Sequence, residues 1–288
     1  MVVLENDELK VTISSKGAEL VSLIDKKDHT EYIWQTVPEI WGYHAPNLFP
    51  IVGGLKDDTL MVDGQKYQMM RHGFARTAAF RRIEDAPQHA QFRLRYDEET
   101  LKSYPYKFEF QVIYHLTGRK LRVMYKVINM DDKTVYFSVG AHPAFNVPFN
   151  KEENFEDYKI EFQYDDELIT HQLSENGLFN GETIKIPTEN QELSLKKALF
   201  EKDALVFKNL KSRAVTLKSK FSNKSLKVIF PHFNYLGIWS KEDAPFICIE
   251  PWLGCADSEG EAKDIKQKEA IQKVDHGHVF ETEFSITV

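Results

Sequence analysis

The segment YKFEFQVIYHLTGRKLRVMYKVIN, residues 106–129, decides the fold. Apolar side chains occupy every second position from residue 108 to 116, and the alternation resumes at Leu121 and continues to Val127. Alternation of this kind places one row of side chains on a single face of a β-strand. Residues 117–120, TGRK, supply a turn between the two runs. The sequence therefore predicts a long antiparallel hairpin.

Further strand-like segments follow at short intervals. Residues 9–24 predict two strands divided by Gly17, residues 32–34 a third, and residues 60–67 a hairpin that turns at Asp63 and Gly64. Other strands are expected at residues 159–164, 204–207, 214–218, 226–230, 236–239, 246–249 and 279–288. Helical periodicity is weak: residues 97–101 predict one turn, and residues 192–200 and 264–274 are the better helix candidates. The pattern predicts an all-β sandwich or barrel with few short helices. Because no linker marks a boundary, residues 1–288 are expected to form one domain.

Composition excludes several classes of partner. The chain has 288 residues, a net charge of −7 and no basic run, which argues against nucleic acid and anionic membranes. No apolar run approaches the ~20 residues of a membrane span, and the N-terminus lacks the features of a secretory signal. The two cysteines, Cys248 and Cys255, form no disulfide framework. We therefore expect a cytoplasmic protein.

Residues 139–148, VGAHPAFNVP, place His142 directly before Pro143 at the end of a strand-like run. Proline disfavours the α region for the residue before it, so His142 is expected in an extended conformation where the strand gives way to a loop. An imidazole can give or take a proton near neutral pH. A single histidine at a strand end is more often structural, so other residues must decide between the two interpretations.

Two further clusters could carry chemistry. In residues 71–76, RHGFAR, two arginines flank His72, and guanidinium groups suit carboxylates, phosphates and sugar hydroxyls; a solvated basic loop is the alternative. In residues 248–254, CIEPWLG, Glu250 is read as the end of an apolar strand. Burial would raise its pKa toward the range of a general base, whereas an ion pair with Arg76 would be structural. Trp252 offers a flat face for a sugar ring.

The remaining features carry less information. His276 and His278 have metal-like spacing but lack cysteine or carboxylate partners at matching spacing, which favours a surface loop. Trp41, with its neighbours at residues 43 and 44, fits either a pocket wall or packing. Cys248 alternates with isoleucines and is read as a core or site-lining residue. No phosphate loop, Gly-x-Ser-x-Gly or CxxC motif is present. We therefore predict neither a metal nor a cofactor, and the residues alone favour proton transfer on a small polar molecule.

Taken together, these clusters resemble the aldose 1-epimerase (galactose mutarotase-like) family, most closely its LacX-like branch. The matching segments span nearly the whole chain and keep the family's order: residues 47–53 (NLFPIVG), 71–76 (RHGFAR), 140–148 (GAHPAFNVP), 203–207 (DALVF), 237–239 (GIW) and 249–254 (IEPWLG). The resemblance implies a β-supersandwich of the galactose mutarotase type. It also implies a sugar site on a concave sheet face.

The resemblance further implies a role for each matching residue. Glu250 matches the base that removes the proton from the anomeric hydroxyl, and His142 matches the acid that protonates the ring oxygen. His72 matches the second active-site histidine, which holds the sugar near the ring oxygen. The predicted sugar-binding residues are Arg71, His72, Arg76, Asp203, Asn47 and Trp252, with Asp203 read as a hydroxyl acceptor.

One position departs from the family. Relatives commonly carry arginine where this chain has Gly54, and in the hexose-6-phosphate branch that arginine helps to hold the phosphate. Its absence favours a free hexose, although Arg71, Arg76 and Lys56 could compensate. The resemblance thus implies a cofactor-independent aldose 1-epimerase for a small-molecule hexose, and we expect a monomer or homodimer. The alternatives are a hexose-6-phosphate 1-epimerase and a non-catalytic carbohydrate-binding protein on the same fold.

Overall fold

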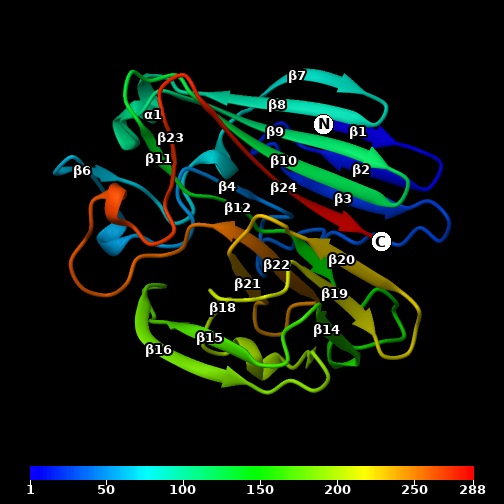
Figure 1. Cartoon of the computed structure of the whole chain (residues 1–288). Coiled ribbons are helices and arrows are strands. Elements are labelled where there is room, and N and C mark those ends of the chain that lie inside the picture. The colour runs from blue at the N-terminus through cyan, green and yellow to red at the C-terminus, as the bar shows by residue number, and fades with distance from the viewer.

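The computed structural model describes residues 1–288, which form two large antiparallel sheets (Figure 1). The larger sheet has nine strands, in the order β17 (Glu192–Ser194), β14 (Tyr158–Phe162), β19 (Ala214–Ser219), β20 (Ser225–Ile229), β24 (Val279–Thr287), β10 (Lys120–Asn129), β9 (Phe108–Thr117), β8 (His89–Arg95) and β7 (Arg81–Ala86). The second sheet has eight strands. Its order is β16 (Phe179–Ile186), β15 (Leu168–Leu173), β18 (Leu205–Phe207), β21 (Tyr235–Trp239), β22 (Phe246–Leu253), β12 (Val139–Ala141) and β4 (Asn47–Leu48), with β13 (Ala144–Asn146) also paired to β22.

Smaller elements complete the chain. A three-stranded sheet joins β1 (Val2–Glu5), β2 (Leu9–Ile13) and β3 (Leu20–Asp25); β5 (Thr59–Val62) pairs with β6 (Gln65–Gln68), and β11 (Val135–Phe137) with β23 (Gln272–Val274). The single α-helix, α1 (Glu98–Ser103), is capped by Asp97, whose side chain accepts from the backbone N–H of Thr100. Five 3-10 turns cover Lys56–Asp58, Ala75–Thr77, Phe155–Asp157, Lys197–Phe200 and Ile265–Gln267. No helix is both long and apolar enough to cross a membrane.

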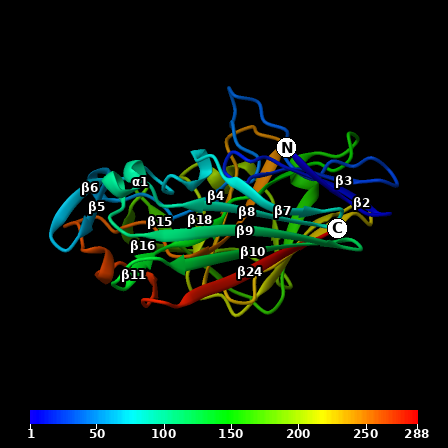
Figure 2. The ribbon, with the colours of Figure 1, turned by 90° about the horizontal axis from the view of Figure 1, so that it is seen from above.

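The hairpin predicted at residues 106–129 is β9 and β10, and it forms the middle of the nine-stranded sheet. Its apolar face packs on the second sheet. The ring of Phe110 stacks on Phe49, just after β4, with centroids 4.5 Å apart. The Tyr125 hydroxyl donates to Oδ1 of Asn47 on β4 at 2.7 Å. The main core of 66 buried residues therefore lies largely between the two layers, which Figure 2 shows from above.

The eight-stranded sheet buries apolar side chains on both faces. On β22, Ile247 and Ile249 join the main core, whereas Cys248 and Trp252 belong to two smaller buried clusters. Period-two alternation requires this division, because successive side chains of a strand point to opposite faces. Glu250 shares the face of Cys248 and Trp252. The face turned away from the main core therefore carries the polar and aromatic groups that the sequence analysis singled out.

Several local predictions are wrong. Residues 32–34 form no strand, because Ile33 makes only an isolated bridge to Phe145. Residues 192–200 and 264–274 contain no α-helix; each holds a short strand, β17 or β23, and a 3-10 turn. These strands form by pairing with β14 and β11, which are distant in sequence, so tertiary contacts override the local pattern. Finally, β22 does not end at Glu250 but continues through Pro251 to Leu253.

Candidate active site

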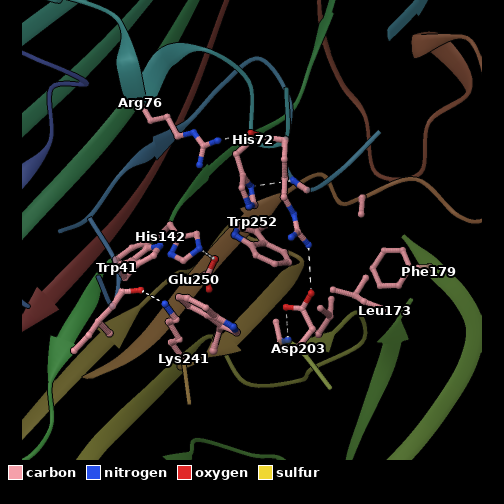
Figure 3. A pocket seen from close by; sticks show the side chains of 17 residues that line it. Trp41, His72, Arg76, His142, Leu173, Phe179, Asp203, Lys241, Glu250 and Trp252 are labelled. Atoms are coloured by element: carbon pink, nitrogen blue, oxygen red, sulfur yellow. Dashed lines mark hydrogen bonds and ion pairs between the residues drawn. The ribbon is translucent and has the colours of Figure 1, made fainter. Parts of the chain in front are cut away.

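A cavity of about 530 Å³ opens on the outer face of the eight-stranded sheet, within the size range of small-molecule sites (Figure 3). Side chains from strands and loops distant in sequence line it. They are Ile40, Trp41, Gly53, Arg71, His72, Arg76, His142, Leu173, Phe179, Asp203, Ala204, Val206, Trp239, Lys241, Glu250, Trp252 and Ala256.

The register of the sheet brings His142 and Glu250 together. Gly140 pairs with Trp252 on one side of the break between β12 and β13, and Ala144 pairs with Cys248 on the other. The two pairings share one register, which places His142 directly opposite Glu250. Side chains of such cross-strand pairs are neighbours. Nε2 of His142 lies 3.1 Å from Oε2 of Glu250.

Burial disfavours charge on both members of this pair. It raises the pKa of Glu250 well above its usual range, and the nearby charge of Asp203 acts in the same direction. Burial lowers the pKa of His142 to about 3, and the positive charges of Arg76 and Arg71 add to this shift. Burial therefore favours the neutral form of each group, the carboxylic acid of Glu250 and the unprotonated imidazole of His142.

His72 is held in one tautomer by the backbone of Gly53. The backbone N–H of Gly53 donates to the ring nitrogen Nδ1 of His72 at 3.1 Å, and the backbone N–H of His72 donates to the Gly53 carbonyl at 2.9 Å. Since Nδ1 accepts, the ring proton of the neutral imidazole is on Nε2. Burial lowers the pKa of His72 well below its usual range, with further lowering from His142 and the two arginines. His72 therefore offers a fixed N–H donor, and its ring centroid is 5.6 Å from that of His142.

The two arginines have different partners. Arg71 forms an ion pair with Asp203, with Nη2 and Oδ2 3.5 Å apart. Arg76 has no carboxylate partner: its Nη2 donates to the Arg71 carbonyl at 2.9 Å, its guanidinium lies over Tyr43 at 5.2 Å, and its buried Nε has no acceptor. Burial lowers the pKa of Arg76 from its ordinary value. Arg76 thus retains donor capacity for a ligand oxygen.

Trp252 lies across two glycines at the base of the cavity. A methyl group on Gly237 would lie 2.7 Å from Cη2 and Cζ2 of the indole, and one on Gly140 would lie 2.7 Å from its Cδ1. Contacts this short do not occur between real side chains, so both positions must be glycine for the indole to lie where it does. Its Nε1 is buried without a hydrogen-bond partner.

Trp41 covers His142. The two rings stack with centroids 5.1 Å apart and an interplanar angle of 27°. The ring of Trp239 packs edge-on against that of His142, with centroids 6.0 Å apart. The loop carrying Trp41 is fixed by Lys241, whose Nζ donates to the carbonyls of Glu39 at 3.1 Å and Ile40 at 2.6 Å. A ring face next to the imidazole favours its protonated form, because the aromatic quadrupole attracts a cation.

Most residues singled out in the sequence meet in this cavity: His142, Glu250, Arg71, His72, Arg76, Asp203 and Trp252. Asn47 does not, which corrects its prediction as a sugar-binding residue. Its buried amide donates to the carbonyls of Gly17 and Ala18 and accepts from Tyr125, so its hydrogen bonds hold the fold. The proposed structural ion pair between Glu250 and Arg76 is also absent.

Other lining residues were missed. Trp239 shares the face of Gly237 on β21, so strand alternation could have identified it. Trp41 was left open between a pocket wall and packing, and it does both. No sequence signal indicates Leu173, Phe179 or Lys241, because their positions depend on how β15, β16 and a loop are arranged in space.

The space beside Gly54 is filled. A methyl group there would lie 3.3 Å from the Gly177 carbonyl and 3.5 Å from Leu178, so a turn at residues 174–178 covers this position. Gly177 in turn lies against the guanidinium of Arg71: a methyl group on Gly177 would be 2.3 Å from its Nη2. A side chain at position 54 would therefore press on this turn.

Comparison with known proteins identifies relatives over the whole fold. The family model described as Aldose 1-epimerase matches residues 1–262. Protein LacX of Lactococcus lactis subsp. lactis, in its plasmid and chromosomal forms, is 38% identical over 280 residues, which cover 94% of this chain and 93% of the relative.

Two solved structures of related proteins have the same fold as this chain. A galactose mutarotase related enzyme from Lactobacillus acidophilus superimposes with a TM-score of 0.94 at 35% identity, covering 99% of this chain and 96% of that one. A galactose mutarotase-like protein from Lactobacillus casei ATCC 334 also has a TM-score of 0.94, at 33% identity, with coverage of 100% and 99%. These matches confirm the predicted fold, an all-β galactose mutarotase-like architecture.

Proposed function

Because the chain belongs to the aldose 1-epimerase family, whose members are sugar isomerases, we propose that it interconverts the α and β anomers of a free hexose without a cofactor. The observation that carries the proposal is the contact of 3.1 Å between His142 and Glu250 at the base of the cavity. A proton donor and a proton acceptor at this separation can serve two oxygens of one sugar ring.

In the proposed reaction, the Glu250 carboxylate takes the proton of the anomeric hydroxyl while the His142 imidazolium gives one to the ring oxygen. The bond between C1 and the ring oxygen breaks, and an open-chain aldehyde forms. The aldehyde group rotates about the C1–C2 bond, and the ring closes on the other face of the carbonyl. Glu250 then returns its proton to the anomeric oxygen, and His142 regains the proton of the ring oxygen. No proton is gained or lost over the cycle, so the pair needs no exchange with solvent.

Burial favours the protonation state of His142 and Glu250 that is present while the sugar is open. The closed sugar requires the charged pair, a carboxylate and an imidazolium, whereas the open-chain aldehyde is bound by the neutral pair. The directions of both pKa shifts favour the neutral pair. Burial therefore stabilises the protonation state that accompanies the ring-opened aldehyde, and the site must also support the charged pair from which the reaction starts. Stacking of Trp41 on His142 opposes this bias and keeps the imidazolium accessible.

The other polar groups match the hydroxyls of a pyranose. His72 provides an N–H donor beside His142, and Arg76 provides unpaired donors. The carboxylate of Asp203 can accept from hydroxyls, while Arg71 fixes its position. The indole of Trp252 supplies a flat apolar surface for the C–H face of the ring.

A free hexose is favoured over a phosphorylated one. A phosphate requires guanidinium groups free to bind its oxygens. Arg71 is paired with Asp203, and the turn that contains Gly177 lies against Gly54, so Arg76 is the one cavity arginine with unpaired donors.

Polarimetry of freshly dissolved α-glucose and α-galactose tests the proposal. We expect the protein to accelerate the approach to anomeric equilibrium, and Glu250→Gln to lower kcat/KM by about 10²–10⁴-fold, the usual contribution of a general base. Binding of the sugar by Glu250→Gln, measured by calorimetry, should persist.

One control variant and two contrary outcomes define what the assay can show. His278→Gln, a change in the surface turn before β24, should leave the rate unchanged. If the spontaneous rate is unaltered for every sugar in a panel while sugars still bind, the chain is a binding protein on an epimerase fold. If glucose 6-phosphate is turned over with a higher kcat/KM than glucose, the preference for a free hexose is wrong.

A further inference from the structure

Cys248 has no part in the proposed reaction, yet its Sγ lies within 4.8 Å of the reacting groups of His142 and Glu250. It precedes Glu250 by two residues on β22, so both side chains point to the cavity side of the sheet. The thiol is fully buried in a small cluster with Trp34, Ala144 and Phe246.

Three different donor atoms converge at this point. A ring nitrogen of His142, Sγ of Cys248 and a carboxylate oxygen of Glu250 all lie within 4.8 Å of one another. Glu250 is 1% exposed, and its Oε2 accepts no hydrogen bond. A buried carboxylate oxygen without a donor is costly unless something binds it. This oxygen points toward His142 and the cavity (Figure 3).

The donor set suits a soft or borderline cation. Zn²⁺ is bound by cysteine sulfur at about 2.3 Å and by histidine nitrogen at about 2.0–2.1 Å, often with three protein ligands and one open position. Two ligands of one tetrahedral ion are then roughly 3.3 Å apart, close to the 3.1 Å between Nε2 of His142 and Oε2 of Glu250. A modest movement of the Cys248 side chain would complete three ligands, and the cavity provides the open position.

We propose that His142, Cys248 and Glu250 form a binding site for a thiophilic divalent cation such as Zn²⁺, which inhibits the protein reversibly. The cation is an inhibitor, because it occupies the two groups that move protons in the proposed reaction; the inhibitory part of this inference rests on that function. Because the ligands bind in their deprotonated forms, binding releases the thiol proton of Cys248 and any proton on the Glu250 carboxyl to solvent.

The charges around the cavity restrict which cations bind. Arg71, Arg76 and Lys241 line it with positive charge, and only Asp203 adds a further carboxylate. A hard cation such as Mg²⁺ prefers several oxygen ligands and forms no strong bond to sulfur. The bond to the Cys248 thiolate therefore decides selectivity, so Zn²⁺ and Co²⁺ should bind whereas Mg²⁺ should not.

The test combines Co²⁺ spectroscopy with inhibition by Zn²⁺ in chelator-free buffer. The wild-type protein should show a sulfur-to-cobalt charge-transfer band and lose anomerase activity at micromolar Zn²⁺. Cys248→Ala should lack the band, and its inhibition constant for Zn²⁺ should rise at least tenfold. Cys255→Ala is the matched control, because Cys255 is the other buried thiol but contacts the Glu269 carbonyl instead. It should behave as wild type.

The inference is overturned if Cys248→Ala keeps the wild-type sensitivity to Zn²⁺, if the wild-type protein shows no thiolate band, or if Mg²⁺ inhibits equally. Should Cys248→Ala fail to fold, Cys248→Ser provides the same comparison with a smaller change in packing. The cobalt band requires no activity. A protein that shows a Cys248-dependent band but no anomerase activity would keep the metal site and contradict the proposed function.

Discussion

Replacing Gly237 with alanine should disturb the base of the cavity without touching the proton-transfer groups. The added methyl would lie 2.7 Å from two ring carbons of Trp252, whereas ordinary van der Waals contact begins at 3.4 Å, so the indole must move by about 0.7 Å. It has little room to do so. Its other edge lies against Gly140, and the side chain is 5% exposed.

Overpacking of this kind costs about 1–3 kcal/mol. A chain of this size loses roughly 2–4 °C in Tm per kcal/mol, so Tm should fall by about 2–12 °C. Because the indole is proposed to support the sugar while His142 and Glu250 do the chemistry, KM should rise by a larger factor than kcat falls. Circular dichroism melts and polarimetric kinetics measure the two effects.

Two variants separate this clash from a general effect of alanine. Gly42→Ala is the matched control, because no atom lies within 4 Å of its added methyl, and it should leave Tm unchanged. In a Trp252→Leu background, Gly237→Ala should cost little further stability, since the ring carbons that it meets are gone. An unchanged Tm for Gly237→Ala, or an equal loss in both backgrounds, would refute the reasoning.

Three other changes test the site. Trp41→Leu removes the ring stacked on His142 and should lower kcat about tenfold, with Trp41→Phe retaining most activity; equal rates for leucine and tryptophan would contradict the stacking argument. Gly54→Arg should collide with the turn at Gly177, lowering Tm and activity on free hexose without creating activity on hexose 6-phosphate, as assayed with both sugars. Glu250 has a raised pKa in the fold, so its contribution to the free energy of unfolding is complete below about pH 4.5 and is lost as pH rises through the folded value, at up to 1.36 kcal/mol per pH unit. Glu250→Gln should therefore flatten that decline in urea unfolding between pH 4.5 and 8, and an unaltered decline would show that burial does not raise the pKa.

The sequence predicts strands well where alternation is long. The hairpin of β9 and β10 follows from residues 108–127 alone, because ten-residue strands with one apolar face leave little ambiguity. Short strands such as β17 and β23 could not be predicted. Each has three residues, and each exists because a distant partner supplies its hydrogen bonds.

Some residues of the candidate site could also be predicted from local sequence patterns, whereas others depend on the tertiary structure. His142 and Glu250 stood out because each precedes a proline, and the cluster at residues 71–76 because two arginines flank His72. Asn47 was misjudged, since its place in a matching segment says nothing about which way its amide points. Leu173 and Phe179 could not be found, because the cavity wall they form is set by the path of β15 and β16.

The pairing of β22 with β12 and β13 explains the positions of Pro143 and Pro251. Since His142 stands opposite Glu250, Pro143 and Pro251 flank this pair, one on each strand. Proline donates no ladder hydrogen bond, and it is tolerated in a sheet only where pairing is interrupted. The strands are interrupted here, between β12 and β13, but the backbone stays in register. The His142 N–H donates to the Pro46 carbonyl at 3.1 Å, which continues the pairing of β12 with β4. On the other side, the Ile249 N–H donates to the Pro143 carbonyl at 3.2 Å. The pair therefore lies where β12 ends and β13 has not yet begun, while backbone hydrogen bonds to both neighbouring segments hold the chain in register. The same interruption that weakened the strand signal in the sequence marks the place where the chemistry is proposed to occur.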